Sequence, residues 1–307
     1  MKNFADRLNE AIKAKGSAIC VGLDPRMNQI PEHITEAAAK EHKDPFVAAA
    51  AAIIEFNKGI IDAVHELVPC VKPQVAFYEI FGAPGMQAYK ETIDYAQSKD
   101  LIVIADCKRN DIGSTAKAYA DAYLGMTDVY GESRAAFDAD ALTVTPYLGY
   151  DGIKPFIENC KEFGKGIFVL VKTSNPSSGD LQDLELKEGG QMFEIMGQLV
   201  DSWGANDIGE SGYNFVGAVV GATYPEQAKK LREIMPNAIF LVPGYGAQGG
   251  GAEDVKPCFK EDGTGAIVNS SRGITFAYEK DENYGPKEYA EAARAAVEAM
   301  KKDLSKI

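Results

Sequence analysis

The stretch LIVIADCKRNDIGST, residues 101–115, contains one unit of the pattern from which the fold can be predicted. Its first four residues are apolar, and near-continuous apolarity is typical of a strand buried on both faces. Residues 113–115 resemble the start of a helix. The charged side chains between the two include Asp106, Lys108 and Asp111. The stretch predicts a buried strand that ends in charged groups and leads into a helix.

Similar units recur along the chain. Seven further apolar runs lie at 18–23, 68–77, 141–145, 167–171, 215–221, 238–242 and 266–269. Segments with helical spacing lie at 46–67, 88–98, 114–124, 153–163, 191–200, 225–235 and 288–300. Eight apolar runs that alternate with helical segments predict an α/β fold, a closed (β/α)8 TIM barrel, in a single domain over residues 1–307. A doubly wound open sheet is the structural alternative.

Three segments exceed the minimal barrel pattern: residues 25–44, 125–139 and 201–213. They lengthen the chain beyond the ~250 residues typical of such a barrel. We expect peripheral helical insertions, as decoration or alternatively as lids or surfaces for a partner.

Composition excludes several classes of function. The 45 acidic and 32 basic residues give a net charge of -13, which argues against binding nucleic acid or an anionic membrane. The charged N-terminal stretch MKNFADRLNE lacks the apolar segment of a signal peptide, so we expect a cytoplasmic protein.

The cysteines and histidines give little support for metal or triad chemistry. The five cysteines are scattered without a CxxC pair, which argues against zinc or redox chemistry. All three histidines precede residue 66, which argues against a multi-histidine metal site or a Ser/His/Asp arrangement. We therefore expect chemistry that does not use histidine.

Charged residues gather where the predicted strands end, the face that carries the active site of such barrels. Asp24 and Lys72 belong to the first two strands, and Asp106 and Lys108 end the third. Residues two apart in a strand point the same way, so Asp106 and Lys108 are expected to form an ion pair at the barrel mouth. The structural alternative is a salt bridge followed by a helix cap from Asp111 or Ser114.

The ends of the last two strands indicate a phosphate site. The glycine-rich stretch PGYGAQGGG, residues 243–251, follows the seventh strand, and Arg272 follows the eighth. Loops at these positions commonly bind phosphate through backbone N–H groups, and arginine adds a charged bidentate contact. Together they predict a phosphomonoester ligand.

Several motifs resemble those of the orotidine 5'-phosphate decarboxylase family, in its longer bacterial subgroup. The central one is DCKRNDIGST, residues 106–115, which matches an Asp-x-Lys-x-x-Asp-Ile signature. The others are GLDPR at 22–26, VKPQVAFYE at 71–79, KTSNPSSGDLQ at 172–182, VPGYGAQGG at 242–250 and NSSRGI at 269–274.

The resemblance implies a homodimeric barrel with shared active sites that converts orotidine 5'-monophosphate to uridine 5'-monophosphate and CO₂ without cofactor or metal. This is the last step of de novo pyrimidine nucleotide biosynthesis. Lys108 matches the lysine that protonates C6, Asp106 the carboxylate beside the departing CO₂, and Lys72 a lysine that links the charged network to the ribose. The other implied contacts are Asp24 to a ribose hydroxyl, Asp111, Ile112 and Thr115 across the dimer interface, Ser174 to the pyrimidine amide, and Gln248 and Arg272 to the phosphate. Ser271 stands where many relatives have a glycine whose backbone N–H binds the phosphate. Serine keeps this N–H, so the resemblance leaves open only how closely the backbone approaches the phosphate.

Two alternatives have other functions. The 3-keto-gulonate-phosphate decarboxylases and hexulose-phosphate synthases resemble this family and use Mg²⁺, but they place an acid near the end of the second strand, where this chain has Lys72. The second alternative is a non-catalytic barrel that binds nucleotides.

Overall fold

Eight parallel strands form a closed barrel in the computed structural model, which describes residues 1–187, 189–246 and 251–307. Their order around the barrel is β1-β10-β9-β8-β7-β6-β3-β2, which confirms the predicted (β/α)8 architecture. The bounds are β1 Ile19–Leu23, β2 Cys70–Pro73, β3 Ile102–Arg109, β6 Ala141–Val144, β7 Gly166–Lys172, β8 Asn214–Val220, β9 Ala238–Val242 and β10 Ala266–Ser270.

The strands form where the apolar runs predicted them because they are buried along almost their whole length. Every residue of β1, β8 and β9 is buried, as expected for parallel strands covered on both faces. The run at 68–77 is the exception, since β2 ends at Pro73 and a short helix, α4 (Ala76–Glu79), follows.

The described chain divides into two compact units. The first unit contains residues 1–10, 108–269 and 304–307, and the second contains residues 11–107 and 270–303. The single-domain organisation stays a prediction, and the two units are described separately below.

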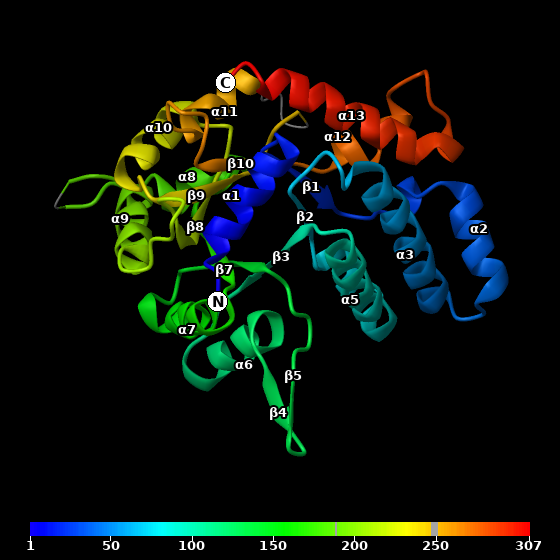
Figure 1. Cartoon of the computed structure of the whole chain (residues 1–307), viewed down its shortest axis with the longest axis horizontal. Coiled ribbons are helices and arrows are strands. Elements are labelled where there is room, and N and C mark those ends of the chain that lie inside the picture. Colours follow the sequence, from blue (N-terminus) through cyan, green and yellow to red (C-terminus); the bar gives the residue numbers. More distant parts are fainter. Residues whose placement is uncertain (188, 247–250) are drawn as a thin grey trace. The chain divides into compact units, whose positions relative to one another are not determined.

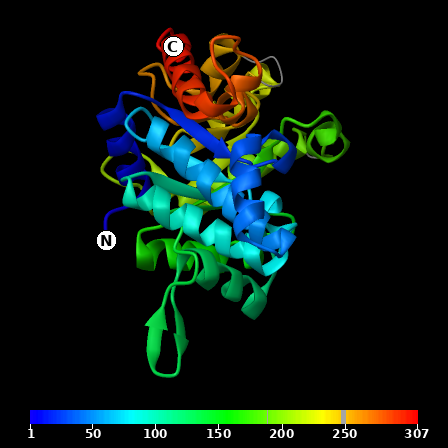
Figure 2. The ribbon, with the colours of Figure 1, turned by 90° about the vertical axis from the view of Figure 1, so that its right-hand side faces the viewer.

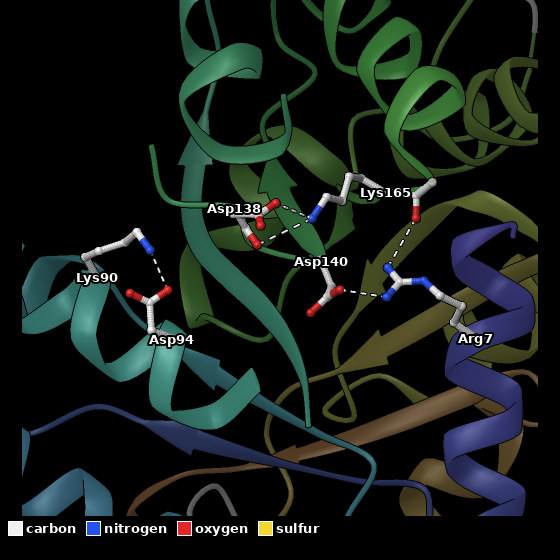
Figure 3. Close-up of polar contacts among 7 residues, drawn as sticks. Arg7, Lys90, Asp94, Asp138, Asp140 and Lys165 are labelled. Atoms are coloured by element: carbon white, nitrogen blue, oxygen red, sulfur yellow. Dashed lines mark hydrogen bonds and ion pairs between the residues drawn. The ribbon is translucent and has the colours of Figure 1, made fainter. Parts of the chain in front are cut away.

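Helices pack side by side in the second unit. The long α3 (Pro45–Val64) lies between α2 (Glu32–Glu41) and α5 (Gly82–Ser98) (Figures 1 and 2). The Asp44 carboxylate accepts hydrogen bonds from the N–H groups of Phe46 and Val47 and so caps α3. On the surface of α5, Lys90 pairs with Asp94 one turn later (Figure 3). The unit also contains α12 (Arg272–Thr275) and most of α13 (Tyr289–Leu304).

Helices of the first unit cover its strands. Helix α6 packs on α7, and α9 packs on β8 and α10. The bounds are α6 Gly113–Leu124, α7 Lys154–Phe163, α8 Gly179–Gln182, α9 Met192–Gly204, α10 Pro225–Ile234 and α11 Ala252–Val255. Short 3-10 helices in the chain lie at Met27–Gln29, Tyr150–Gly152, Pro176–Ser178, Lys256–Cys258, Ala277–Glu279 and Pro286–Glu288.

The three insertions differ in structure. Residues 25–44 contain α2, as expected of a helical insertion. The expectation is wrong for residues 125–139, which form a hairpin of β4 (Thr127–Val129) and β5 (Glu132–Arg134) that projects from its unit (Figures 1 and 2). In the third insertion α9 continues to Gly204, and an isolated bridge joins Ile208 to Asn214.

The sequence did not predict α1 (Phe4–Lys15), whose first turns cover the starts of two strands in the first unit. The Phe4 ring meets Phe168 of β7 edge to face, with centroids 6.0 Å apart. Arg7 donates to Asp140 Oδ1 at 2.8 Å and to the carbonyl of Gly164 at 3.2 Å (Figure 3). Figure 3 also shows Lys165 bonded to Asp138, just before β6.

No helix in the described ranges is both long enough and apolar enough to cross a membrane.

The contact between Phe4 and Gly166 gives a test of this packing. A Cβ at Gly166 would lie 2.2 Å from the Phe4 ring, so Gly166→Ala should lower the free energy of unfolding by about 1–3 kcal/mol through overpacking. Phe4→Ala should cost about 3–5 kcal/mol because the side chain is fully buried.

Denaturant unfolding of the double variant, Gly166→Ala with Phe4→Ala, tests whether the cost of Gly166→Ala comes from a clash with the Phe4 ring. Because Phe4→Ala makes room for the new methyl group, the two costs should sum to more than the cost of the double variant. Gly285→Ala is the matched control, since its Cβ would meet only ordinary contact distances. Strict additivity would contradict the proposed clash.

Candidate functional site

In the second unit, a buried ion pair lies at the carboxyl ends of β2 and β3. Lys72 Nζ lies 2.6 Å from Asp106 Oδ2, and the two side chains are 7% and 9% exposed. The strand register places them together, because Gln74 and Asp106 form a parallel bridge and Val75 N–H donates to the Asp106 carbonyl. The sequence placed both residues at this rim, but it did not predict that they pair with each other.

The charge on Lys72 is stabilised by two acids. Burial lowers the pKa of Lys72, but the negative charges of Asp106 and Asp24 outweigh that effect and hold the pKa above its usual value. Lys72 is therefore an ammonium at neutral pH. The site pairs this positive charge with Asp106 and exposes it to the negative charge of Asp24, and Lys72 and Asp106 are both largely removed from water.

Asp24 follows directly after β1 and is only partly satisfied. Its Oδ1 atom is buried and accepts no hydrogen bond from any described residue. The position of the strand end is fixed by Tyr78, whose hydroxyl donates to the carbonyl of Leu23 at 3.3 Å and accepts from Asn57 Nδ2 at 2.9 Å. A buried acceptor without a partner is costly, so this carboxylate is suited to bind a hydroxyl donor of a ligand.

Arg26 is a candidate that the sequence reasoning missed. Its Nε atom is buried and has no hydrogen-bond partner in the described part of the chain, and the same holds for Ser271 Oγ in this unit. The Arg26 guanidinium lies 5.4 Å from the centre of the Phe77 ring, which limits its orientation. Its place two residues after Asp24 in GLDPR was the available signal.

In the first unit, Lys108 has an unusual backbone conformation. Its φ of 48° lies in the left-handed region, which costs a non-glycine residue of the order of 1–3 kcal/mol. Thr143 of β6 holds it there by accepting the Lys108 N–H at 3.0 Å, and the Thr145 hydroxyl donates to the Lys108 carbonyl at 3.4 Å. The Lys108 side chain is exposed. Regular strand alternation therefore ends at this residue, and its predicted pairing with Asp106 stays a prediction.

Asp111, Ile112 and Thr115 lie at the start of α6. The Asp111 carboxylate accepts the N–H of Ile112 at 2.8 Å, whereas no side chain of the described residues caps the N-terminus of α6. The suggested helix cap from Asp111 or Ser114 is therefore wrong. Ile112 is 55% exposed, and Thr115 is also exposed. The side chains of Asp111, Ile112 and Thr115 are thus available to contact a ligand or a partner.

The other predicted residues are distributed over both units. Ser174 follows β7 in the first unit and is half-buried, while Arg272 begins α12 in the second unit and is exposed. Gln248 lies outside the described residues. Within the described ranges, no three His, Cys, Asp or Glu side chains gather as a candidate metal cluster.

Comparisons with known proteins cover nearly the whole chain. A model of the orotidine 5'-phosphate decarboxylase / HUMPS family matches residues 17–285. The chain is 49% identical over 307 residues to the orotidine 5'-phosphate decarboxylase of Rhodopirellula baltica, with 99% of each chain covered. It is 46% identical to the enzyme of that name from Caldicellulosiruptor bescii over 305 residues, with 99% of each chain covered.

A solved structure is also similar. The putative orotidine 5'-phosphate decarboxylase of Streptomyces avermitilis superposes with a TM-score of 0.79 at 31% identity, covering 100% of this chain and 96% of that one. The family model, the relatives and the barrel agree, and the chain belongs to the orotidine 5'-phosphate decarboxylase / HUMPS family.

Proposed function

We propose that this protein decarboxylates orotidine 5'-monophosphate to uridine 5'-monophosphate and CO₂, the last step of de novo pyrimidine nucleotide biosynthesis. The observation that carries the proposal is the buried Lys72–Asp106 pair beside the unsatisfied carboxylate of Asp24. Burying such charges is costly, so their presence at strand ends favours a functional role. Full-length relatives named for this activity support the same assignment.

In the proposed mechanism, Lys108 stabilises and then quenches a carbanion. Loss of CO₂ leaves an electron pair at C6 in the plane of the pyrimidine ring, where the ring π system does not delocalise it. An ammonium fixed next to C6 lowers the energy of the developing negative charge and then donates the proton that replaces CO₂. The Thr143 bond to the Lys108 backbone supports this role, because it holds the residue in one conformation before the substrate arrives.

The acids at the strand ends have different proposed roles. Asp106 lies beside the substrate carboxylate and favours its departure by repulsion, while its bond to Lys72 keeps it ionised and oriented. Asp24 accepts a ribose hydroxyl, which would satisfy its buried Oδ1. Lys72 connects the two acids. The ribose is thereby held next to the reacting ring.

The remaining contacts hold the two ends of the nucleotide. Ser174 is proposed to bind the pyrimidine amide, and Gln248 and Arg272 the phosphate. Arg26 Nε and Ser271 Oγ are buried and have no hydrogen-bond partner among the described residues, which supports further polar contacts from the same unit as Arg272. Phosphate binding far from C6 contributes to catalysis when its energy is used to bring the reacting groups together.

We also propose a homodimer in which Asp111, Ile112 and Thr115 reach the active site of the partner. An exposed apolar surface around the start of α6 supports this: Ile112 is 55%, Tyr147 75% and Leu148 47% exposed. A Cβ at Gly152 would lie 2.9 Å from the carbonyl oxygen of Asp111 and 3.5 Å from Cβ of Leu148, so the segment that carries Leu148 is a neighbour of the start of α6. Burial of such a surface against a second copy would remove it from water.

The cytoplasm is the proposed location of the enzyme. All five cysteines are free and buried, which suits a reducing compartment.

Turnover of orotidine 5'-monophosphate after treatment with EDTA is the first test. The change in ultraviolet absorbance of the pyrimidine monitors the reaction. We expect full activity, because the proposed catalytic groups are all side chains of this protein. Activity that disappears with EDTA and returns with Mg²⁺ would contradict the proposal and favour the metal-dependent branch of the family.

Two lysine variants should separate chemistry from stability. Lys108→Ala should lower kcat by at least about 10²–10⁴-fold, yet change the free energy of unfolding by less than about 0.5 kcal/mol because the side chain is exposed. Lys72→Ala should lower both kcat and the free energy of unfolding. The loss of unfolding free energy should be about 3–5 kcal/mol, because the Asp106 carboxylate stays buried without its cation. Equal stability of wild type and Lys72→Ala would disprove the role of the ion pair.

The shared site can be tested by mixing inactive homodimers. Random exchange of Lys108→Ala and Asp111→Ala subunits makes about half of the dimers mixed, and each mixed dimer has one intact site. Up to about a quarter of all sites should therefore regain activity if Asp111 acts across a two-fold interface. If exchange is verified by mass spectrometry and activity stays at zero, Asp111 does not act across the interface.

A further inference from the structure

A second buried lysine lies behind the loop that carries Ser174. Lys172, the last residue of β7, is 0% exposed, and its Nζ atom donates to Asp183 Oδ1 at 2.7 Å. The ammonium also lies 4.4 Å from the centre of the Tyr224 ring. Lys172 has none of the roles proposed above. The Asp183 side chain is 31% exposed, so only the lysine of this ion pair is fully buried. An ion pair of this kind is weak evidence of a contribution to stability, so its effect on the segment around it is of interest.

Asp183 is held from three directions. Besides Lys172, it accepts a hydrogen bond from Gln227 Nε2 of α10 at 3.0 Å, and its carbonyl accepts one from Gln191 Nε2 at 3.3 Å. The bond from Lys172 lowers the pKa of Asp183, burial opposes this, and the bond from Gln227 lowers it further. Asp183 is therefore an ionised anchor between the end of β7 and the start of α10.

Gln182, the residue before Asp183, forms hydrogen bonds with the loop that carries Ser174. Gln182 Oε1 accepts the N–H of Thr173 at 2.9 Å, and Gln182 Nε2 donates to the Thr173 hydroxyl at 2.9 Å. That hydroxyl donates in turn to Asn175 Oδ1 at 2.6 Å. The two bonds from one amide fix both the backbone and the side chain of Thr173. Gln182 and Asp183 thus hold the two residues that precede Ser174.

Ser174 is also confined from the side of β8. A Cβ at Gly221 would lie 2.9 Å from both the backbone N and the Cβ of Ser174, so only glycine allows this approach. The Ser174 hydroxyl itself makes no hydrogen bond to any other residue that the structure describes. The loop is therefore fixed on both sides while the hydroxyl remains available to a ligand.

We propose that Gln182 and Asp183 are positioning residues that set the Ser174 hydroxyl against the pyrimidine ring, and that they control recognition of the ring and not of the phosphate. This inference rests on the proposed function, in which Ser174 contacts the pyrimidine amide. A single rigid arrangement of Thr173 and Ser174 pre-organises the contact, so the ordering of the loop does not oppose binding.

The test compares a ligand that has the ring with one that lacks it. Gln182→Ala should lower kcat/KM for orotidine 5'-monophosphate, and weaken calorimetric binding of uridine 5'-monophosphate, by about tenfold, the order of one lost hydrogen bond. Binding of ribose 5-phosphate should stay unchanged. Gln182→Glu keeps the acceptor for Thr173 N–H and should restore part of the loss. Gln198→Ala, an exposed glutamine on α9, is the matched control.

A double-mutant cycle identifies the route of the effect. In a Ser174→Ala background, Gln182→Ala should cause little further loss if it acts through Ser174. Equal weakening of both ligands, or strict additivity with Ser174→Ala, would overturn the inference and indicate a structural role. If Gln182→Ala does not fold, Asp183→Asn serves in the same cycle, because it keeps the size of the side chain and removes its charge.

Failure of this inference can be told apart from failure of the proposed function. Wild-type protein that does not convert orotidine 5'-monophosphate disproves the function. Wild-type turnover together with an unaffected Ser174→Ala variant disproves the pyrimidine contact and the positioning role that depends on it. Loss in Ser174→Ala without loss in Gln182→Ala disproves the positioning role alone.

Discussion

A lysine ammonium buried at the end of β2 is the constraint on which the candidate site depends. Removing Lys72 from water is unfavourable unless negative groups surround it, and Asp106 and Asp24 are those groups. The arrangement needs the ends of β1, β2 and β3 at one rim, which parallel strands in a closed barrel provide. One buried oxygen of Asp24 has no hydrogen-bond partner among the residues that the structure describes, so the charges are balanced while the hydrogen bonds are not complete. A ligand hydroxyl can donate the hydrogen bond that this oxygen lacks.

The strands were predictable because each is buried on both faces and is therefore apolar along its length. The run at 238–242 coincides with β9 (Ala238–Val242). The strand predicted at 68–77 was too long at its end, because apolarity does not distinguish a strand from the short helix α4. Helix α1 was missed because its buried face is partly polar: Asp6 is buried and accepts the N–H groups of Glu210 and Ser211. Such long-range contacts leave no periodic pattern in the sequence.

The hairpin at 127–134 and the conformation of Lys108 escaped prediction for a related reason. The hairpin turns at Tyr130 and Gly131, both with positive φ, although tyrosine is not a usual turn residue at such a position. Lys108 adopts a positive φ because Thr143 binds its backbone from another strand. The charged candidates were identified from their positions at strand ends, and Ile112 and Thr115 from the family resemblance. The pairing of Lys72 with Asp106 and the exposure of Lys108 depend on tertiary contacts. Gln248 lies outside the described residues, so its role stays a prediction.

The two buried lysines at strand ends show how similar residues receive different roles. Lys172 bonds to Asp183, whose Oδ1 also accepts from Gln227, and Tyr224 lies against the ammonium. Because Lys172 is fully buried, its ammonium is not accessible to a ligand and instead fixes the chain around it. Lys72 interacts electrostatically with Asp24, whose buried Oδ1 accepts no hydrogen bond within the described part of the chain. Burial alone therefore does not identify a functional charge. The unsatisfied neighbour does, because only there does binding of a substrate supply the missing hydrogen bond.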